Sequence, residues 1–140
     1  KDNITSKTSA LAENAKGIIR ASCNSNVNKA VLLLNGWKNP GEILIVDLEE
    51  LIEKTVFQTN MAGIDPENLV EPKNITMNAR DDIQLHGLLY LPKPATIKDG
   101  GLPPVVFSVH GGPTEQSRPN FSPHAQYLLG KCIAVFYPNV

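Results

Sequence analysis

Short apolar stretches separated by turn-forming residues divide the first half of the chain. Aliphatic side chains concentrate at residues 17–23, 29–34, 42–48 and 54–58, and asparagine, glycine, proline or acidic residues stand between these runs. Strand-sized apolar runs joined by short polar turns are typical of antiparallel β-structure. We therefore expect this half to form a sheet of short strands, as in a β-sandwich or a blade of a β-propeller.

The apolar pattern dissolves between residues 60 and 72, where two prolines stand and no periodicity is sustained. This stretch is predicted to be a linker or a surface loop. Beyond it, residues 74–78 alternate between polar and apolar positions, a polar turn follows, and residues 83–91 are again rich in apolar side chains. This order predicts a β-hairpin.

The end of the chain has the order strand, loop, helix, strand. Residues 104–109 are a nearly continuous apolar run with three valines, which suits a strand that is buried on both faces. Ser122 and Pro123 are suited to the cap and first position of a helix, and Gly130 is suited to its C-terminal stop. Residues 132–137 are expected to form another buried strand. Such a unit predicts an α/β sheet.

The chain is thus expected to have two unlike halves, a β-rich part with its linker over residues 1–72 and the opening of an α/β sheet over residues 73–140. The fold class is mixed β and α/β. So few strands with one helix do not complete a parallel sheet, and the sequence does not begin with methionine. We therefore expect these 140 residues to be part of a longer protein.

Composition narrows the classes of function. The formal net charge is −1, with 41% hydrophobic and 19% charged residues, so the basic surface expected of a nucleic-acid-binding protein is missing. No basic run, signal sequence or membrane-length apolar run is present. Cys23 and Cys132 are far apart and are expected to be buried thiols, and nothing resembles a metal-binding pair.

The motif His110-Gly111-Gly112-Pro113 directly follows the predicted strand 104–109. Adjacent glycines permit unusual backbone angles and a close approach of the backbone to a ligand. In α/β hydrolases the loop after an early strand aims backbone N–H groups at the oxyanion of an acyl-transfer transition state. Pro113 has no N–H group, so the donors would be Gly111 and Gly112. The alternative is an ordinary tight turn.

Four stretches around this motif carry a resemblance to a known family. They are residues 102–113, the helix residues 126–129, the strand 133–139 and the hairpin 75–92. Together they resemble the start of the catalytic domain in acylaminoacyl-peptidase-like members of the prolyl oligopeptidase family. Residues 39–48 are similar to the closing β-propeller blade of that family. The resemblance covers most of residues 17–140 and is strongest over 74–139.

The resemblance implies one or more partial β-propeller blades over residues 1–72 and the N-terminal part of an α/β-hydrolase domain over residues 73–140. It also implies that the amides of Gly111 and Gly112 line an oxyanion hole and that His110 begins the loop. Glu115, Arg118 and Asn120 are near enough in sequence to this loop to be candidates for substrate contact.

The nucleophile elbow of the family, Gly-x-Ser-x-Gly, does not occur in these 140 residues. The acid and the histidine of the triad follow the nucleophile in the chain order of this fold. The triad is therefore expected to lie outside the chain. We assign no triad role to the serines and histidines near the motif or in the hairpin, which are Ser108, Ser117, Ser122, His86, His110 and His124. His86 and His124 are expected to be surface or packed residues.

Three functions are compatible with the sequence. The first is a serine peptidase that works through an acyl-enzyme, with a peptide as substrate and no cofactor or metal. The second is a carboxylesterase of the α/β-hydrolase type, and the third is a non-catalytic binding module of the propeller type. Neither nucleic acid nor a membrane is an expected partner, a homo-oligomer is left open, and the cytoplasm is the default location.

Overall fold

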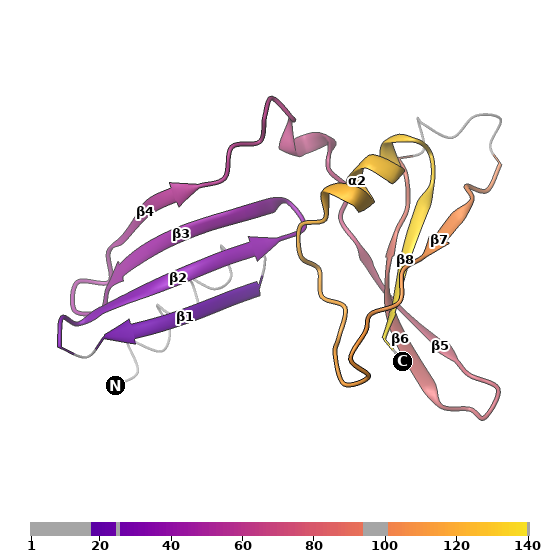
Figure 1. Cartoon of the computed structure of the whole chain (residues 1–140), viewed down its shortest axis with the longest axis horizontal. Helices are drawn as coiled ribbons and strands as arrows, with labels where there is room; N and C mark the ends of the chain where they lie inside the picture. Colours follow the sequence, from indigo (N-terminus) through magenta and orange to yellow (C-terminus); the bar gives the residue numbers. More distant parts are fainter. Residues whose placement is uncertain (1–17, 25, 94–100, 140) are drawn as a thin grey trace.

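The computed structural model describes residues 18–24, 26–93 and 101–139, and the described strands form two four-stranded sheets. The first sheet is an antiparallel meander in which each strand pairs with the next one along the chain. Figure 1 shows it at one end of the molecule. Its strands are β1 (Ile18–Asn24), β2 (Lys29–Gly36), β3 (Asn39–Asp47) and β4 (Glu53–Gln58).

The alternation of side chains along β2 and β3 gives the first sheet one buried face. Ala30 and Leu34 of β2 and Leu44 and Val46 of β3 are all less than a tenth exposed. Successive side chains of a strand point to opposite faces, so the neighbouring Leu33 is 43% exposed. The four strands predicted for this half are confirmed, and their period of two explains which aliphatic residues are buried.

The second sheet is mixed, with the strand order β5-β6-β8-β7. The first two pairs in this order are antiparallel, whereas β7 and β8 are parallel. The helix α2 (Pro123–Gly130) lies beside the sheet (Figure 1). The strands are β5 (Lys73–Asn78), β6 (Gln84–Tyr90), β7 (Val105–Phe107) and β8 (Ala134–Asn139). The hairpin, the helix and the parallel pair that the sequence predicted are therefore present.

Helix α2 and the two central strands share a small apolar core. Leu88 and Tyr90 of β6, Ala125 and Leu129 of α2 and Val135 of β8 form a single cluster of buried side chains. Ala125 and Leu129 are four positions apart, which places both on one face of the helix. This packing holds helix α2 and strand β8 in place. The loop between β7 and α2 is therefore attached to rigid elements.

Three local predictions are wrong. The residues between the apolar runs 29–34 and 42–48 were expected to form the connection, but β2 runs to Gly36 and β3 starts at Asn39, leaving a two-residue turn. The strand at 104–109 is only three residues long and lies at the edge of the described sheet, where Phe107 is 67% exposed. A strand with one neighbour, away from the helix, is not buried on both faces. Neither cysteine is a buried thiol, since Cys23 is exposed and Cys132 is half-buried.

The boundaries of helix α2 agree with the sequence, but its C-terminal cap does not. Ser122 is the N-cap, and its Oγ accepts a hydrogen bond from the N–H of Ala125 at 3.2 Å. The helix ends at Gly130, yet the left-handed residue after it is Cys132, with a φ of 62°. The N–H groups of Cys132 and Ile133 donate to carbonyls of the last helical turn, each at 3.0 Å. This is a Schellman cap with cysteine where glycine is usual.

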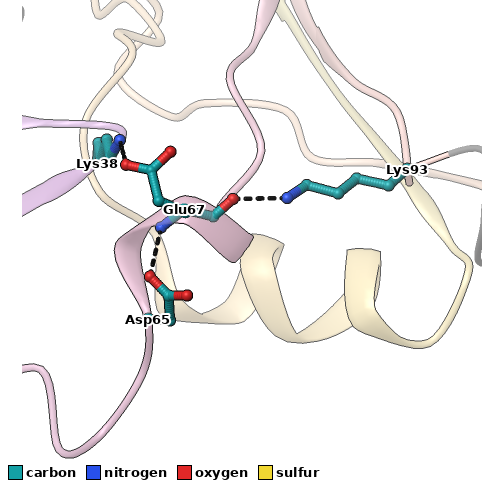
Figure 2. Close-up of polar contacts among 4 residues, drawn as sticks. All are labelled: Lys38, Asp65, Glu67 and Lys93. Atoms are coloured by element: carbon teal, nitrogen blue, oxygen red, sulfur yellow. Dashed lines mark hydrogen bonds and ion pairs between the residues drawn. The ribbon is translucent and has the colours of Figure 1, made fainter.

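The predicted linker contains a short 3₁₀ helix, η1 (Pro66–Asn68), that contacts a residue next to each sheet. Figure 2 shows the side chain of Glu67 paired with Lys38, which lies in the β2–β3 turn. From beyond β6, Lys93 Nζ donates to the carbonyl oxygen of Glu67 at 2.6 Å. The N–H of Glu67 donates to Oδ1 of Asp65 at 2.9 Å, which caps the turn. An ion pair and a hydrogen bond therefore hold η1 against the residues next to both sheets.

Within the described part of the chain, no helix is long and apolar enough to cross a membrane.

Candidate functional site

The loop that leaves β7 and enters α2 runs between the two sheets (Figure 1). It begins with Ser108, whose N–H donates to the carbonyl of Phe136 at 2.9 Å and continues the pairing with β8. His110 follows two residues later, and its Nδ1 is 2.9 Å from the carbonyl oxygen of Gly111. An oxygen acceptor requires a proton on Nδ1, so a neutral ring presents a lone pair at Nε2. The ring is therefore poorly suited to donate to an oxyanion from Nε2.

The two glycines of the motif differ in whether the backbone angle and the surrounding space allow a side chain. Gly112 has a φ of 102°, and a Cβ there would lie 2.7 Å from Cγ of Glu115. Both the backbone angle and the space at Gly112 therefore require glycine. Gly111 has open space, since a Cβ at this position would have no atom within 4 Å. Neither amide has a hydrogen-bond acceptor among the described residues, so both N–H groups are available to a ligand.

A side-chain amide at the end of β8 holds the middle of this loop. Asn139 accepts a hydrogen bond from the N–H of Ser117 at 2.7 Å through Oδ1 and donates to the carbonyl of Ser117 at 3.2 Å through Nδ2. These two hydrogen bonds have the pattern of those that two residues exchange across neighbouring strands of a sheet. Because β8 is anchored in the core, this contact ties the loop to a rigid element.

A second side-chain amide joins the loop to the first sheet. Oδ1 of Asn35, at the end of β2, accepts from the N–H of Phe121 at 2.9 Å, and its Nδ2 donates to the carbonyl of Pro40 at 3.1 Å. Asn35 thus contacts the β2–β3 hairpin and the segment just before helix α2. It fixes the distance between the first sheet and the end of the loop.

Two of the open cavities that border the loop lie next to the glycine motif. The inter-sheet cavity measures about 610 Å³ and faces the first sheet. The His110 cavity measures about 300 Å³ and faces β6 and β8. The inter-sheet cavity is lined by Arg20, Leu33, Asn35, Thr114, Glu115, Gln116, Arg118 and Asn120. Gln116, Arg118 and Asn120 also line the His110 cavity, so the two spaces share a wall.

Two tyrosines form one side of the His110 cavity. The rings of Tyr90 and Tyr137 meet edge to face, with centroids 5.8 Å apart. Burial, with a smaller contribution from Tyr137, raises the pKa of Tyr90 to about 12. The hydroxyl of Tyr137 lies 3.4 Å from Oγ of Ser122. Tyr90 therefore presents a neutral ring at physiological pH.

Of the serines and histidines to which we assigned no triad role, Ser108, His110, Ser117 and Ser122 line the His110 cavity, whereas His86 and His124 do not. Ser117 is held through its backbone, and Ser122 caps helix α2. His86 is exposed on β6 with Nδ1 3.3 Å from Thr76, and His124 is exposed in the first turn of α2. In the described ranges, no three His, Cys, Asp or Glu side chains are grouped so as to hold a metal ion.

Sequence reasoning missed the residues that hold the loop. Asn35 and Asn139 stand far from the glycine motif in the sequence, and an isolated asparagine carries no signal of such a role. Arg20 was also missed, because it lies on β1 and reaches the loop only through the arrangement of the two sheets. Glu115, Arg118 and Asn120, the candidates for substrate contact, all line the inter-sheet cavity.

No family model and no curated protein sequence matches the chain, whereas many solved structures share its fold. A puromycin hydrolase mutant complexed with PGG is 25% identical with a TM-score of 0.71 over 85% of this chain. A puromycin-hydrolyzing peptidase of Mycobacterium tuberculosis is 21% identical with a TM-score of 0.74 over 86% of this chain. The acylaminoacyl peptidase of Pyrococcus horikoshii is 23% identical with a TM-score of 0.65 over 86% of this chain.

The chain spans less than a fifth of these proteins, 18% of the puromycin hydrolase mutant and of the Pyrococcus enzyme and 19% of the mycobacterial one. A prolyl endopeptidase structure matches over a similar extent, with a TM-score of 0.73 at 14% identity. The resemblance seen in the sequence is confirmed by these likenesses: the chain has the fold of one segment of serine peptidases of the prolyl oligopeptidase family.

Proposed function

We propose that this chain supplies the oxyanion loop of a serine peptidase that hydrolyses peptides through an acyl-enzyme. The observation that carries the proposal is the pair of amides at Gly111 and Gly112, which have no acceptor among the described residues and lie in a loop held by Asn139. The shared fold with solved serine peptidases supports it. One such neighbour is an acylaminoacyl peptidase in complex with a peptide chloromethyl ketone.

In the proposed reaction, a serine outside these 140 residues attacks the carbonyl carbon of the scissile peptide bond. The carbonyl oxygen becomes an oxyanion, and the N–H groups of Gly111 and Gly112 donate hydrogen bonds to it. Such a donor contributes typically about 3 kcal/mol to the transition state, about a hundredfold in rate. A histidine, also outside the chain and oriented by a carboxylate, takes the proton of the serine hydroxyl and gives it to the amine that leaves as the peptide C–N bond breaks. Water then hydrolyses the acyl-enzyme.

The two described sheets are accounted for by the same proposal. The first sheet corresponds to a blade of a β-propeller, with its linker, over residues 1–72. The second sheet corresponds to the opening strands of an α/β-hydrolase domain over residues 73–140. This assignment explains why a parallel pair, β7 and β8, stands beside antiparallel strands in the second sheet, since mixed sheets are common in such folds.

The test uses the protein that carries this chain and two variants at Gly111. Proline removes the N–H group, whereas alanine keeps it and fits the open space at this position. We expect Gly111→Pro to slow labelling of the protein by a fluorophosphonate by about a hundredfold, and Gly111→Ala to leave the rate within a few fold.

Peptide and ester substrates distinguish the remaining alternatives. Hydrolysis of p-nitrophenyl esters without hydrolysis of any peptide would favour the carboxylesterase. A protein with no labelling and no hydrolysis would be a binding module. The isolated 140-residue chain is expected to remain unlabelled, and stoichiometric labelling of it would contradict the proposal that the nucleophile lies elsewhere.

A further inference from the structure

The inter-sheet cavity carries two arginines from distant parts of the chain. Arg20 comes from strand β1, and Arg118 comes from the loop that follows the glycine motif. Both line the same cavity of about 610 Å³. Glu115 is the one acidic residue in the lining, so the walls have a net charge of about +1.

Neither arginine is neutralised within the described structure. The ion pair found there joins Lys38 and Glu67, away from this cavity. No described residue accepts a hydrogen bond from the guanidinium of Arg20 or of Arg118. The donors of both side chains therefore remain available to an anion that enters the cavity.

We propose that the inter-sheet cavity binds a carboxylate of the peptide substrate between Arg20 and Arg118. A guanidinium has a planar fork of N–H donors that matches the two oxygens of a carboxylate. The other walls supply neutral amides, from Asn35, Gln116 and Asn120, that can bind the neighbouring peptide groups. The carboxylate is either the C-terminus of the peptide or an acidic side chain.

The position of Arg118 connects this recognition to the proposed reaction. Arg118 and its neighbours Gln116 and Asn120 form the wall between the inter-sheet cavity and the His110 cavity. The neighbours of the two glycines border both spaces, since His110 lines the His110 cavity and Thr114 and Glu115 line the inter-sheet cavity. The inference rests on the proposed function in this respect: binding in the cavity selects which peptides present a bond to the loop.

The test compares four peptides that differ in one charge. The first pair is acetyl-tetra-alanine as the free acid and as the C-terminal amide. The second pair consists of amidated peptides of the same length with Glu or Gln at one internal position. With the protein that carries this chain, we expect kcat/KM to be about tenfold to a hundredfold higher for the charged member of at least one pair. The pair that responds identifies the source of the carboxylate.

Variants of residues inside and outside the cavity test whether the preference for the charged peptide arises there. Arg20→Gln and Arg118→Gln should each reduce the preference about tenfold, while Glu115→Gln should increase it because a negative charge leaves the cavity. Lys54→Gln is the matched control, since it removes one positive charge from exposed strand β4 of the same sheet, outside the cavity. Raising the salt concentration should weaken the preference, because the cavity is open and its charges are screened by ions.

Isothermal titration with the same peptides in the presence of a blocked nucleophile gives a readout apart from hydrolysis. Preferential binding of the charged peptide that Arg20→Gln and Arg118→Gln each weaken supports the cavity proposal even if no peptide is cleaved. In that case the proposed function alone fails. Equal kcat/KM and equal affinity for both members of both pairs would overturn the cavity proposal and leave the peptidase proposal standing. The cavity proposal is also overturned if Lys54→Gln lowers the preference as much as the arginine variants do.

Discussion

The side-chain amide of Asn139 pairs with both backbone polar groups of Ser117, 22 positions earlier in the chain. Gln126 of helix α2 makes the same double contact with Val70, which it reaches across 56 positions, at 2.9 and 3.0 Å. In each case a side-chain amide makes the two hydrogen bonds that the backbone of a neighbouring strand would make. These contacts hold irregular segments to regular ones where no backbone ladder is formed.

Asn139→Ala should disturb the loop that carries the glycine motif. The N–H and carbonyl of Ser117 lose their partners, which costs about 1–3 kcal/mol when such groups are part-buried. We expect kcat of the proposed peptidase to fall more than KM changes, because the proposed oxyanion donors become less well placed while substrate contacts remain. Steady-state kinetics and thermal unfolding measure the two effects.

Two further variants separate placement from loss of stability. Asn139→Asp keeps the acceptor for the N–H of Ser117 but sets a carboxylate against the carbonyl, so it should fall between wild type and alanine in kcat. Asn78→Ala, at the exposed end of β5, should leave both measurements unchanged. Equal kinetics for Asn139→Ala and wild type would show that the contact does not position the loop.

Gly112→Ala should be markedly more harmful than Gly111→Ala. At Gly112 the φ of 102° disfavours any side chain, and the new Cβ would meet Glu115. We expect a loss of about 1–3 kcal/mol in unfolding free energy at Gly112 and little change at Gly111. Adding Glu115→Ala to Gly112→Ala should recover only part of the loss, because the backbone angle remains. Denaturant unfolding of the three variants provides the comparison.

Gln126→Ala should loosen the contact between α2 and the segment before β5. Both polar groups of Val70 lose a partner, for an expected cost of about 1–3 kcal/mol. Gln126→Glu keeps the acceptor for the N–H of Val70 but sets a carboxylate against its carbonyl, so it should fall between wild type and Gln126→Ala. His124→Ala, on an exposed site of the same helix, is the control. Hydrogen exchange at the amide of Val70 should rise most in Gln126→Ala, less in Gln126→Glu and not in His124→Ala.

Cys132→Gly should stabilise the protein relative to Cys132→Ala. Cys132 occupies the left-handed position of the helix cap with a φ of 62°, where a Cβ costs about 1–2 kcal/mol. Both variants lose the thiol, so their difference isolates the backbone effect. An alanine variant as stable as the glycine variant in thermal unfolding would contradict this explanation of the cap.

Alkaline pH should destabilise the fold through Tyr90. Its ordinary pKa is 10.0, and burial raises the pKa of Tyr90 to about 12 in the folded protein. Between these values the unfolded chain releases a proton that the folded chain retains, so the contribution of Tyr90 to the unfolding free energy is flat below about pH 10 and falls towards pH 12. Lysines titrate in the same range, which makes Tyr90→Phe the necessary comparison. The slope should be shallower in that variant, and an unchanged slope would refute the assignment.

The elements of this fold were predictable because they are set by local chemistry. The aliphatic alternation of β2 and β3 and the Ser122-Pro123 start of α2 each show in a few consecutive residues. The glycine motif could be recognised for the same reason, since it consists of four consecutive residues.

What escaped prediction depends on pairing across the chain. The exposure of Phe107 follows from the place of β7 at an edge, which its own apolar sequence does not reveal. The role of Asn139 depends on Ser117 lying opposite the end of β8, and that of Arg20 on the first sheet facing the loop. A single sequence holds no record of these juxtapositions.

The amide contacts of Asn35, Gln126 and Asn139 carry no charge. Their strength is therefore nearly independent of ionic strength, in contrast to the proposed binding of a substrate carboxylate by two arginines. A salt titration should then separate the two properties, because recognition of anionic peptides weakens while the loop keeps its shape and its intrinsic reactivity. In a relative adapted to high salt we would therefore expect the arginines to change first, since the amide contacts that hold the loop have no charge for ions to screen.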